Sequence, residues 1–193
     1  VAKIGEEYYT SISEALSSAQ EGDTIELLKD VEENVTNNKN VTMNLSGYKI
    51  TGEFINEGIL KVLNGTIENP NGTGLHNKKT LTLGENDGDV SDTYVKVIGT
   101  EIGLQQDGEF NFYDGYIEGD VALNGKTNSV PKGYYLYTEK NSEKDCQRVY
   151  LIGNPENAVA VITDGGTTQY FFSLQDAIDT SYVTGSEIFV ARD

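Results

Sequence analysis

The feature that most constrains this chain is a short phrase that recurs through its middle part. Each copy has an alternating apolar strand, a bend at Gly or Asn, and an apolar residue about two positions after the bend. The strands span residues 41–45, 60–63, 94–98 and 110–113, and the bends lie at Gly47, Gly65, Gly99 and Gly115. Gly47 and Gly65 are 18 residues apart, and Gly99 and Gly115 are 16 apart. A period of roughly 16 to 20 residues is typical of a parallel β-helix, because only the next turn can bury the inward side chains of the last.

Gly and Asn at the bends fit this architecture. They adopt positive φ at low cost, and stacked Asn side chains can form hydrogen-bond ladders from turn to turn. The alternative is an antiparallel sandwich, which strands at a regular spacing of about 8–12 residues would favour. We favour the β-helix because Asn64-Gly65 and Asp114-Gly115 recur at the same point of the phrase. We therefore predict a mainly β chain, with β-helix rungs over residues 31–158.

Residues 1–30 lack this phrase and predict a strand, a helix and a second strand. Thr10 or Ser11 starts the helix, and Glu14 follows as a capping-box residue. The apolar residues then share one helical face, at Ile12, Ala15, Leu16 and Ala19. We predict an N-terminal α/β cap.

The same motif returns at the end of the chain, in residues 159–193. Ala177 matches Ala15 at an offset of 162, and Ile188 matches Ile25 at an offset of 163. The chain therefore holds one complete unit and the opening of another. Repetition on this scale is typical of arrays built for reach or display.

Residues 124–158 depart from the rhythm of the rungs. Residues 134–137 and 149–152 predict strands, and the polar residues between them predict a turn or loop. We expect a loop or hairpin insertion at about 124–148, within the last rung.

The composition excludes several classes of partner. The net charge is −17, from 31 acidic against 14 basic residues, which repels phosphate backbones and anionic lipid surfaces. We therefore predict no nucleic-acid partner. No apolar run approaches the roughly 20 residues that span a bilayer, so we predict no membrane insertion in this fragment. The single cysteine, Cys146, excludes an internal disulfide and is compatible with export from a bacterium.

A family resemblance adds to these predictions. It rests on Ile4-Gly5, Tyr9 to Ala15, Gly22 to Val31, and Asn40 to Ile50. These segments resemble the opening of many cell-surface repeat proteins of Gram-positive gut bacteria, which are similar to pectate-lyase-like right-handed β-helices. The resemblance implies a right-handed solenoid whose end is covered by the strand-helix-strand motif. The second copy of the motif would cover the other end or begin the next unit of a longer parent chain.

The resemblance also implies a role. It predicts a secreted or cell-surface, adhesin-like module that is not catalytic and serves as a binding unit or spacer. The implied partners are a host or microbial glycan or a surface protein.

The alternative is a carbohydrate-active β-helix enzyme, a polysaccharide lyase or glycoside hydrolase, or its accessory domain. Glycoside hydrolysis needs carboxylates that converge on one cleft. Five acidic residues would cluster on adjacent rungs, namely Asp107, Glu109, Asp114, Glu118 and Asp120. Acidic residues are frequent throughout, however, and neither Arg148 nor Arg192 lies in the regularly repeating part of the rungs, from residue 31 to about residue 123. The only histidine, His76, is interpreted as a bend residue rather than a general base. We predict no catalytic residue.

Tyrosines are the candidate ligand-binding residues. Five of them gather near one end of the predicted solenoid, at Tyr113, Tyr116, Tyr134, Tyr135 and Tyr137. Aromatic faces can stack on sugar rings or anchor a protein partner. Packing of the rings on the sheet surface is the alternative.

The acidic loop at residues 85–92 is the candidate metal site. Hard cations favour clustered carboxylates on a Gly-containing turn, so Ca²⁺ would bind Asp87, Asp89 and Asp92. The loop lacks the EF-hand pattern, and a solvated acidic loop is the alternative. We predict no other cofactor.

Overall fold

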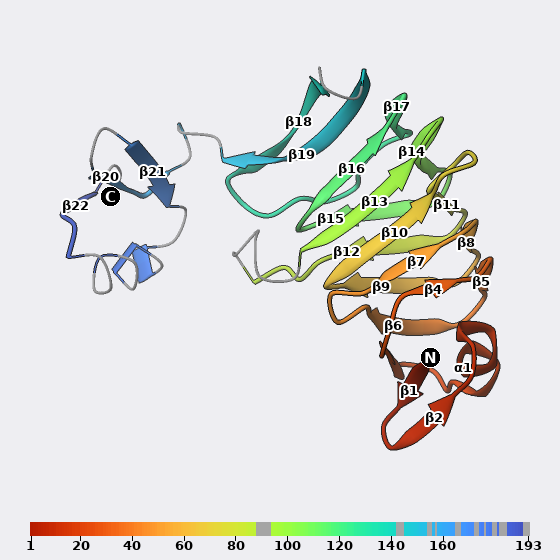
Figure 1. Ribbon diagram of the computed structural model, residues 1–193. Coiled ribbons are helices and arrows are strands. Elements are labelled where there is room, and N and C mark those ends of the chain that lie inside the picture. Colours follow the sequence, from red (N-terminus) through yellow and green to blue (C-terminus); the bar gives the residue numbers. More distant parts are fainter. Residues whose placement is uncertain are drawn as a thin grey trace. The chain divides into compact units, whose positions relative to one another are not determined.

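The described part of the chain is a parallel β-solenoid of about five turns followed by a second, smaller unit (Figure 1). The computed structural model describes residues 1–87, 94–141, 145–153, 156, 158–164, 167–171, 174–175, 177–178, 181 and 185–190. The first compact unit holds Val1–Val130 with Leu136–Leu151, and the second holds Pro131–Tyr135 with Ile152–Asp193.

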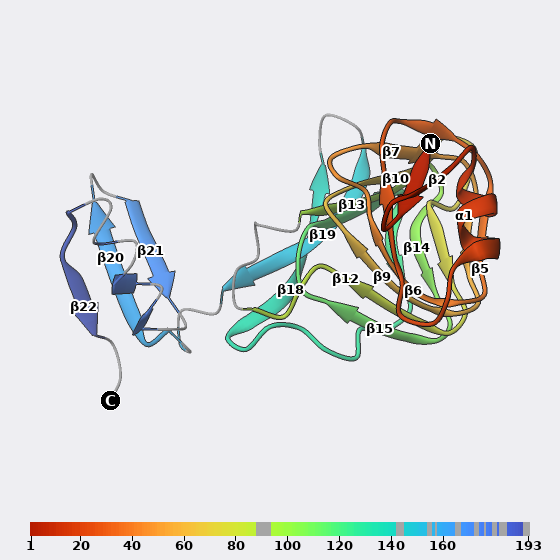
Figure 2. The same ribbon diagram turned by 90° about the horizontal axis from the view of Figure 1, so that it is seen from below.

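Each turn of the solenoid contributes one strand to each of three sheets (Figure 2). The first sheet contains β3 (Thr24–Leu27), β6 (Asn40–Asn44), β9 (Ile59–Leu63), β12 (Thr80–Leu83) and β15 (Glu109–Phe112). The second contains β4 (Val31–Glu32), β7 (Lys49–Thr51), β10 (Gly65–Asn69), β13 (Val95–Gly99) and β16 (Tyr116–Gly119). The third contains β5 (Val35–Asn37), β8 (Phe54–Asn56), β11 (Leu75–Asn77), β14 (Ile102–Gln106) and β17 (Val121–Asn124). Successive turns pair in parallel, so the predicted stacking is confirmed and the sandwich is wrong.

Matching side chains stack in the core from turn to turn. In the first sheet Val41, Leu60, Leu81 and Phe110 lie opposite one another in consecutive strands, and all four are buried. Strand residues alternate between the core and the outer surface, which is why the sequence alternates apolar and polar residues.

Bends with positive φ form the corner between the first and second sheets. Gly47, Asn64 and Gly115 lie there with φ of 85°, 53° and 96°. The prediction is wrong for Gly99, which ends β13 and therefore lies at the next corner. The connection between β12 and β13 in the fourth turn caused the error. It lengthens the offset between stacked residues from 21, for Leu60 and Leu81, to 29, for Leu81 and Phe110.

The expected amide ladder runs inside the third sheet. Nδ2 of Asn37 donates to Oδ1 of Asn56 at 2.8 Å, and Nδ2 of Asn56 donates to Oδ1 of Asn77 at 2.7 Å. Gln106 ends the ladder, where its Oε1 accepts from Nδ2 of Asn77 at 2.7 Å. All four side chains are buried. A buried hydrogen bond between successive turns therefore fixes the register of each turn on the one before it.

The N-terminal cap forms as predicted, with one additional strand. β1 (Ala2–Ile4) pairs antiparallel with β2 (Glu7–Tyr9) and with β3, and α1 (Ile12–Ser18) follows β2. The Ser11 hydroxyl accepts from the backbone N–H of Glu14 at 3.0 Å. The Glu14 carboxylate accepts from the backbone N–H of Thr10 at 2.8 Å, one residue before the usual capping-box partner. The predicted apolar face is buried, and α1 lies at the N-terminal end of the solenoid (Figure 1).

The segment after the fifth turn forms the two predicted strands. β18 (Tyr134–Asn141) pairs with β19 (Cys146–Gly153), and β19 pairs antiparallel with β16 of the second sheet. An antiparallel strand therefore replaces a sixth parallel rung in this sheet.

The second unit repeats the topology of the cap. β20 (Ala160–Asp164) lies between β21 (Thr167–Phe171) and β22 (Ile188–Val190), as β1 lies between β2 and β3. Residues 174, 175, 177, 178 and 181 between β21 and β22 are helical. The predicted second copy of the motif is thus visible in the strand order, and whether it covers an end or begins a unit stays a prediction. In the described residues, no helix has both the length and the apolar character needed to cross a membrane.

Candidate functional site

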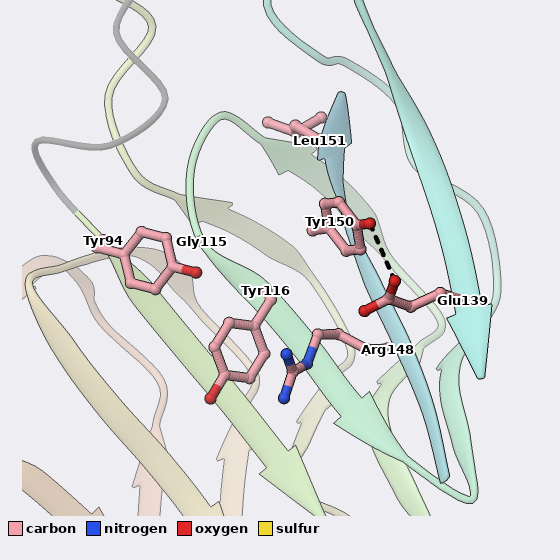
Figure 3. Close-up of a pocket in the computed structure, with 7 residues that line it drawn as sticks. All are labelled: Tyr94, Gly115, Tyr116, Glu139, Arg148, Tyr150 and Leu151. Atoms are coloured by element: carbon pink, nitrogen blue, oxygen red, sulfur yellow. Dashed lines mark hydrogen bonds between the residues drawn. The ribbon is translucent and has the colours of Figure 1, made fainter. Parts of the chain in front are cut away.

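A hollow of about 230 Å³ lies on the outer face of the second sheet, against the β18–β19 hairpin (Figure 3). It is lined by Tyr94, Gly115, Tyr116, Glu139, Arg148, Tyr150 and Leu151. Three of these seven residues are tyrosines, and two, Glu139 and Arg148, are charged.

Strand pairing fixes the positions of its side chains. Lys96 lies opposite Tyr116, and Tyr116 lies opposite Tyr150, so these three form one row across β13, β16 and β19. Glu118 and Arg148 form the next row on the same face, two residues along each strand. The intervening Ile117 is fully buried and points into the core, so the two rows face outward.

Arg148 and Glu118 form a charge pair beneath the hollow. Nε of Arg148 donates to Oε2 of Glu118 at 2.9 Å, and Nη2 donates to the same oxygen. Only 3% of the Glu118 side chain is exposed, against 28% for Arg148. Burial works to lower the pKa of Arg148, but its bond to Glu118 outweighs this and raises it. The guanidinium carbon lies 4.5 Å from the Tyr116 ring centroid, a cation–π distance, so the pair also fixes that ring.

The other tyrosines are held by contacts at the rim. The Tyr150 hydroxyl donates to Oε2 of Glu139 at 3.1 Å (Figure 3), and Tyr137 meets the Tyr150 ring edge to face at 5.6 Å. Tyr94 meets Tyr116 in the same way at 6.0 Å. Burial raises the pKa of Tyr94 and of Tyr150, and Glu139 raises that of Tyr150 further. Both phenols therefore stay protonated at neutral pH, and the Tyr150 proton is the one donated to Glu139.

A second hollow of about 510 Å³ shares Tyr94 with the first. It follows the corner between the first two sheets and is lined by Asn44, Ser46, Gly47, Asn64, Gly65, Thr66, Tyr94 and Lys96. Its lining is polar, with amide and hydroxyl groups. We call the two hollows together the Tyr94 groove.

The Tyr94 groove combines aromatic faces with polar and charged groups. Lys96, Arg148 and Glu139 line it, and the buried Glu118 offsets the charge of Arg148 from below. Nζ of Lys96 lies 5.8 Å from the Tyr94 centroid and 5.9 Å from the Tyr116 centroid. Such a surface can stack on flat apolar faces and bond hydroxyl groups without attracting a strongly charged ligand.

The predicted tyrosines do not form one site. Tyr116 lines the groove and Tyr137 supports it, but the Tyr113 hydroxyl donates to Oγ of Ser129 at 3.1 Å instead. Tyr134 and Tyr135 are assigned to the second compact unit.

Tyr94, Arg148 and Tyr150 line the groove but were not predicted from the sequence as site residues. The prediction that Arg148 lies outside the rungs is wrong, because β19, which contains Arg148, pairs with β16 of the second sheet. The available signal was alternation along residues 148–150, which places Arg148 and Tyr150 on one face.

The acidic residues considered for catalysis lie on different sides of the solenoid. Asp107 accepts from Gln105 at 2.7 Å and lies 2.6 Å from Nε2 of His76. The His76 hydrogen bond is the main cause that lowers the pKa of Asp107. Glu118 belongs to the second sheet, whereas Asp107 follows the third. His76 lies within β11 and not at a bend, because its neighbours Leu75 and Asn77 both point into the core.

The calcium prediction falls mostly outside the described residues. Asp87 is exposed, whereas Asp89 and Asp92 lie outside the described ranges. Among the described residues, no group of three or more His, Cys, Asp or Glu side chains is placed to hold a metal ion. The calcium site stays a prediction.

Comparison of the chain with protein-family models, with curated proteins and with solved structures finds no match.

Proposed function

We propose that this chain is a non-catalytic, carbohydrate-binding β-solenoid module, and that the Tyr94 groove is its binding site. The observation that carries the proposal is the row of Lys96, Tyr116 and Tyr150, which neighbouring strands of one sheet present to the groove beside Tyr94. Sugar rings present an apolar face for stacking and hydroxyl groups for hydrogen bonds, and this groove offers both kinds of contact.

The proposed ligand is a neutral oligosaccharide of a host or microbial glycan. The groove carries charges of both signs, from Lys96, Arg148 and Glu139, and the net charge of −17 repels polyanions. The amide and hydroxyl groups along the corner, such as Asn44 and Asn64, supply hydrogen bonds to a ligand longer than one sugar ring.

We further propose an adhesin-like role for the module, as one unit of a tandem array in a secreted or cell-surface bacterial protein. Two copies of one cap topology in a single chain support the tandem arrangement. A solenoid also suits a spacer, because stacked turns carry a binding face away from its anchor.

Glycan-array binding, run beside a polysaccharide-degradation assay on the same chain, tests this proposal. Tyr116→Ala removes a stacking face, and we expect it to weaken binding by about tenfold, since such contacts contribute about 1.4 kcal/mol. Tyr8→Ala is the matched control, because Tyr8 is exposed on β2 of the cap. Equal loss in both variants, or no glycan binding by the unaltered chain, would contradict the proposal. Polysaccharide cleavage would favour the enzyme alternative.

A further inference from the structure

The second unit matches the N-terminal cap residue for residue in its strand register. Ala160 lies opposite Phe171 and Val190, as Ala2 lies opposite Tyr9 and Leu27. The helical residues correspond at an offset of 162, and the last strands at 163. The paired strand residues and the described helical residues of one copy therefore have defined counterparts in the other, and the β20–β21 hairpin is longer than the β1–β2 hairpin.

The interior of the motif is the same in both copies. Ala2 and its counterpart Ala160 are buried, and so are Ala15 and its counterpart Ala177. Ala160 and Ala177 form a small core with Ile162 and Phe171, with Ile188 packed against it. The second copy is therefore a formed cap motif.

One face of the motif differs completely in exposure. In the first copy Ile12, Leu16 and Leu27 are 0%, 5% and 2% exposed, and their counterparts Leu174, Ile178 and Val190 are 46%, 44% and 62% exposed. The side chains at these positions are aliphatic in both copies. The copies therefore differ in whether other residues bury this face.

The first turns of the solenoid cover this face in the first copy. β3 pairs in parallel with β6, where Ile25 lies opposite Met43, and α1 packs against β5. The Glu33 carboxylate, between β4 and β5, accepts from the backbone N–H of Ile12 and of Ser13, each at 2.9 Å. The covering partner thus has three features: a parallel strand, an aliphatic layer and a carboxylate.

We propose that the second unit is the docking face for the first turns of another β-solenoid, rather than a closed end. The incoming strand would add in parallel to β22, which within the described residues pairs only with β20. Its aliphatic layer would cover Leu174, Ile178 and Val190. This inference rests on the tandem arrangement of the proposed function and specifies the junction between units. The established pairing of β3 with β6 is the template, because it joins the same motif to a strand that follows it in the chain.

A thiol-labelling experiment tests the docking face. Residues 31–152 are appended directly after Asp193, since Asp193 matches Asp30, and every Cys146 is replaced by Ser. Val190→Cys is labelled in the 193-residue chain and in the extended chain. We expect labelling to slow by at least about tenfold in the extended chain, because docked turns would bury this position as they bury Leu27.

Phe189→Cys is the matched control. Phe189 is 56% exposed, and its counterpart Glu26 pairs with Lys3 on the outer side, so docked turns would leave this position reactive. Equal labelling of Val190→Cys in both chains overturns the proposal, whether the appended turns fold elsewhere or remain unfolded. Loss of glycan binding would not change this readout, so the two proposals fail separately.

Discussion

At the scale of single residues, the pair of Glu118 and Arg148 connects the stability of the solenoid with the shape of its groove. Glu118→Gln keeps the size of the side chain but leaves the guanidinium without a carboxylate. We expect the free energy of unfolding to fall by about 2 kcal/mol, less than for a fully buried pair because Arg148 is partly in water. Denaturant unfolding of the full chain measures this change.

An exposed pair on the same solenoid is the control. Lys78 and Glu57 lie 3.0 Å apart with 42% and 48% of their side chains exposed, so Lys78→Gln should change the stability by no more than about 0.5 kcal/mol. Equal losses in the two variants would show that burial does not strengthen the Glu118 pair.

Some residues of the groove and the core could be predicted from the sequence, and others could not. Tyr116 and the existence of an Asn ladder could be predicted, because each depends on strands and bends that neighbouring residues define. The pairing of Arg148 with Glu118 could not, because Glu118 is 30 residues away and is reached only through the antiparallel register of β19. That register depends on the β18–β19 hairpin, which is not part of the repeated motif and so could not be predicted from it.

At the scale of elements, Glu33 joins the N-terminus of α1 to the first turn of the solenoid. Burial works to raise the pKa of Glu33, but hydrogen bonds from Ser13 and Ile12 outweigh it and lower the pKa below its ordinary value of 4.5. A lowered pKa in the folded state means that the unfolded chain binds the proton more tightly. This contribution to stability is therefore present above pH 4.5 and is lost as the pH falls through the folded pKa.

Glu33→Gln tests this connection. At neutral pH we expect a loss of about 1 kcal/mol in the free energy of unfolding, after allowance for the exposure of the carboxylate. The difference from the unaltered chain should shrink as the pH falls below 4.5, because a protonated Glu33 resembles Gln. Denaturant unfolding at several pH values measures both effects. The neighbouring Glu32→Gln is the control, and a pH-independent difference would refute the assignment to Glu33.

Elements were predictable from sequence where their signals are local. The cap motif was found because Ser11, Glu14 and the apolar face of α1 all lie within about two helical turns. The position of Gly99 was not predictable in this way, because the connection between β12 and β13 adds residues to the fourth turn without adding a turn. A periodic phrase gives the stacking of turns but does not reveal which turn carries an insertion.

At the scale of the whole molecule, the chain divides into two units with separate cores, and this predicts two independent stabilities. Ile67 is fully buried in β10 of the solenoid, and Ile162 is buried in the small core of the second unit. Ile67→Ala should destabilise the solenoid by about 3 kcal/mol, the usual cost of such a cavity, and leave the second unit unchanged. Ile162→Ala should have the opposite pattern.

Amide hydrogen exchange separates the two responses, because each unit reports through its own strands. In Ile67→Ala we expect faster exchange in β7, β10 and β13, with unchanged rates in β20 and β21. In Ile162→Ala the rates should rise in β20 and β21 alone. If either substitution accelerates exchange in both units, their folding is coupled. The description of two separately stable units would then be wrong, because a chain that unfolds as one cooperative whole transmits a cavity to every strand.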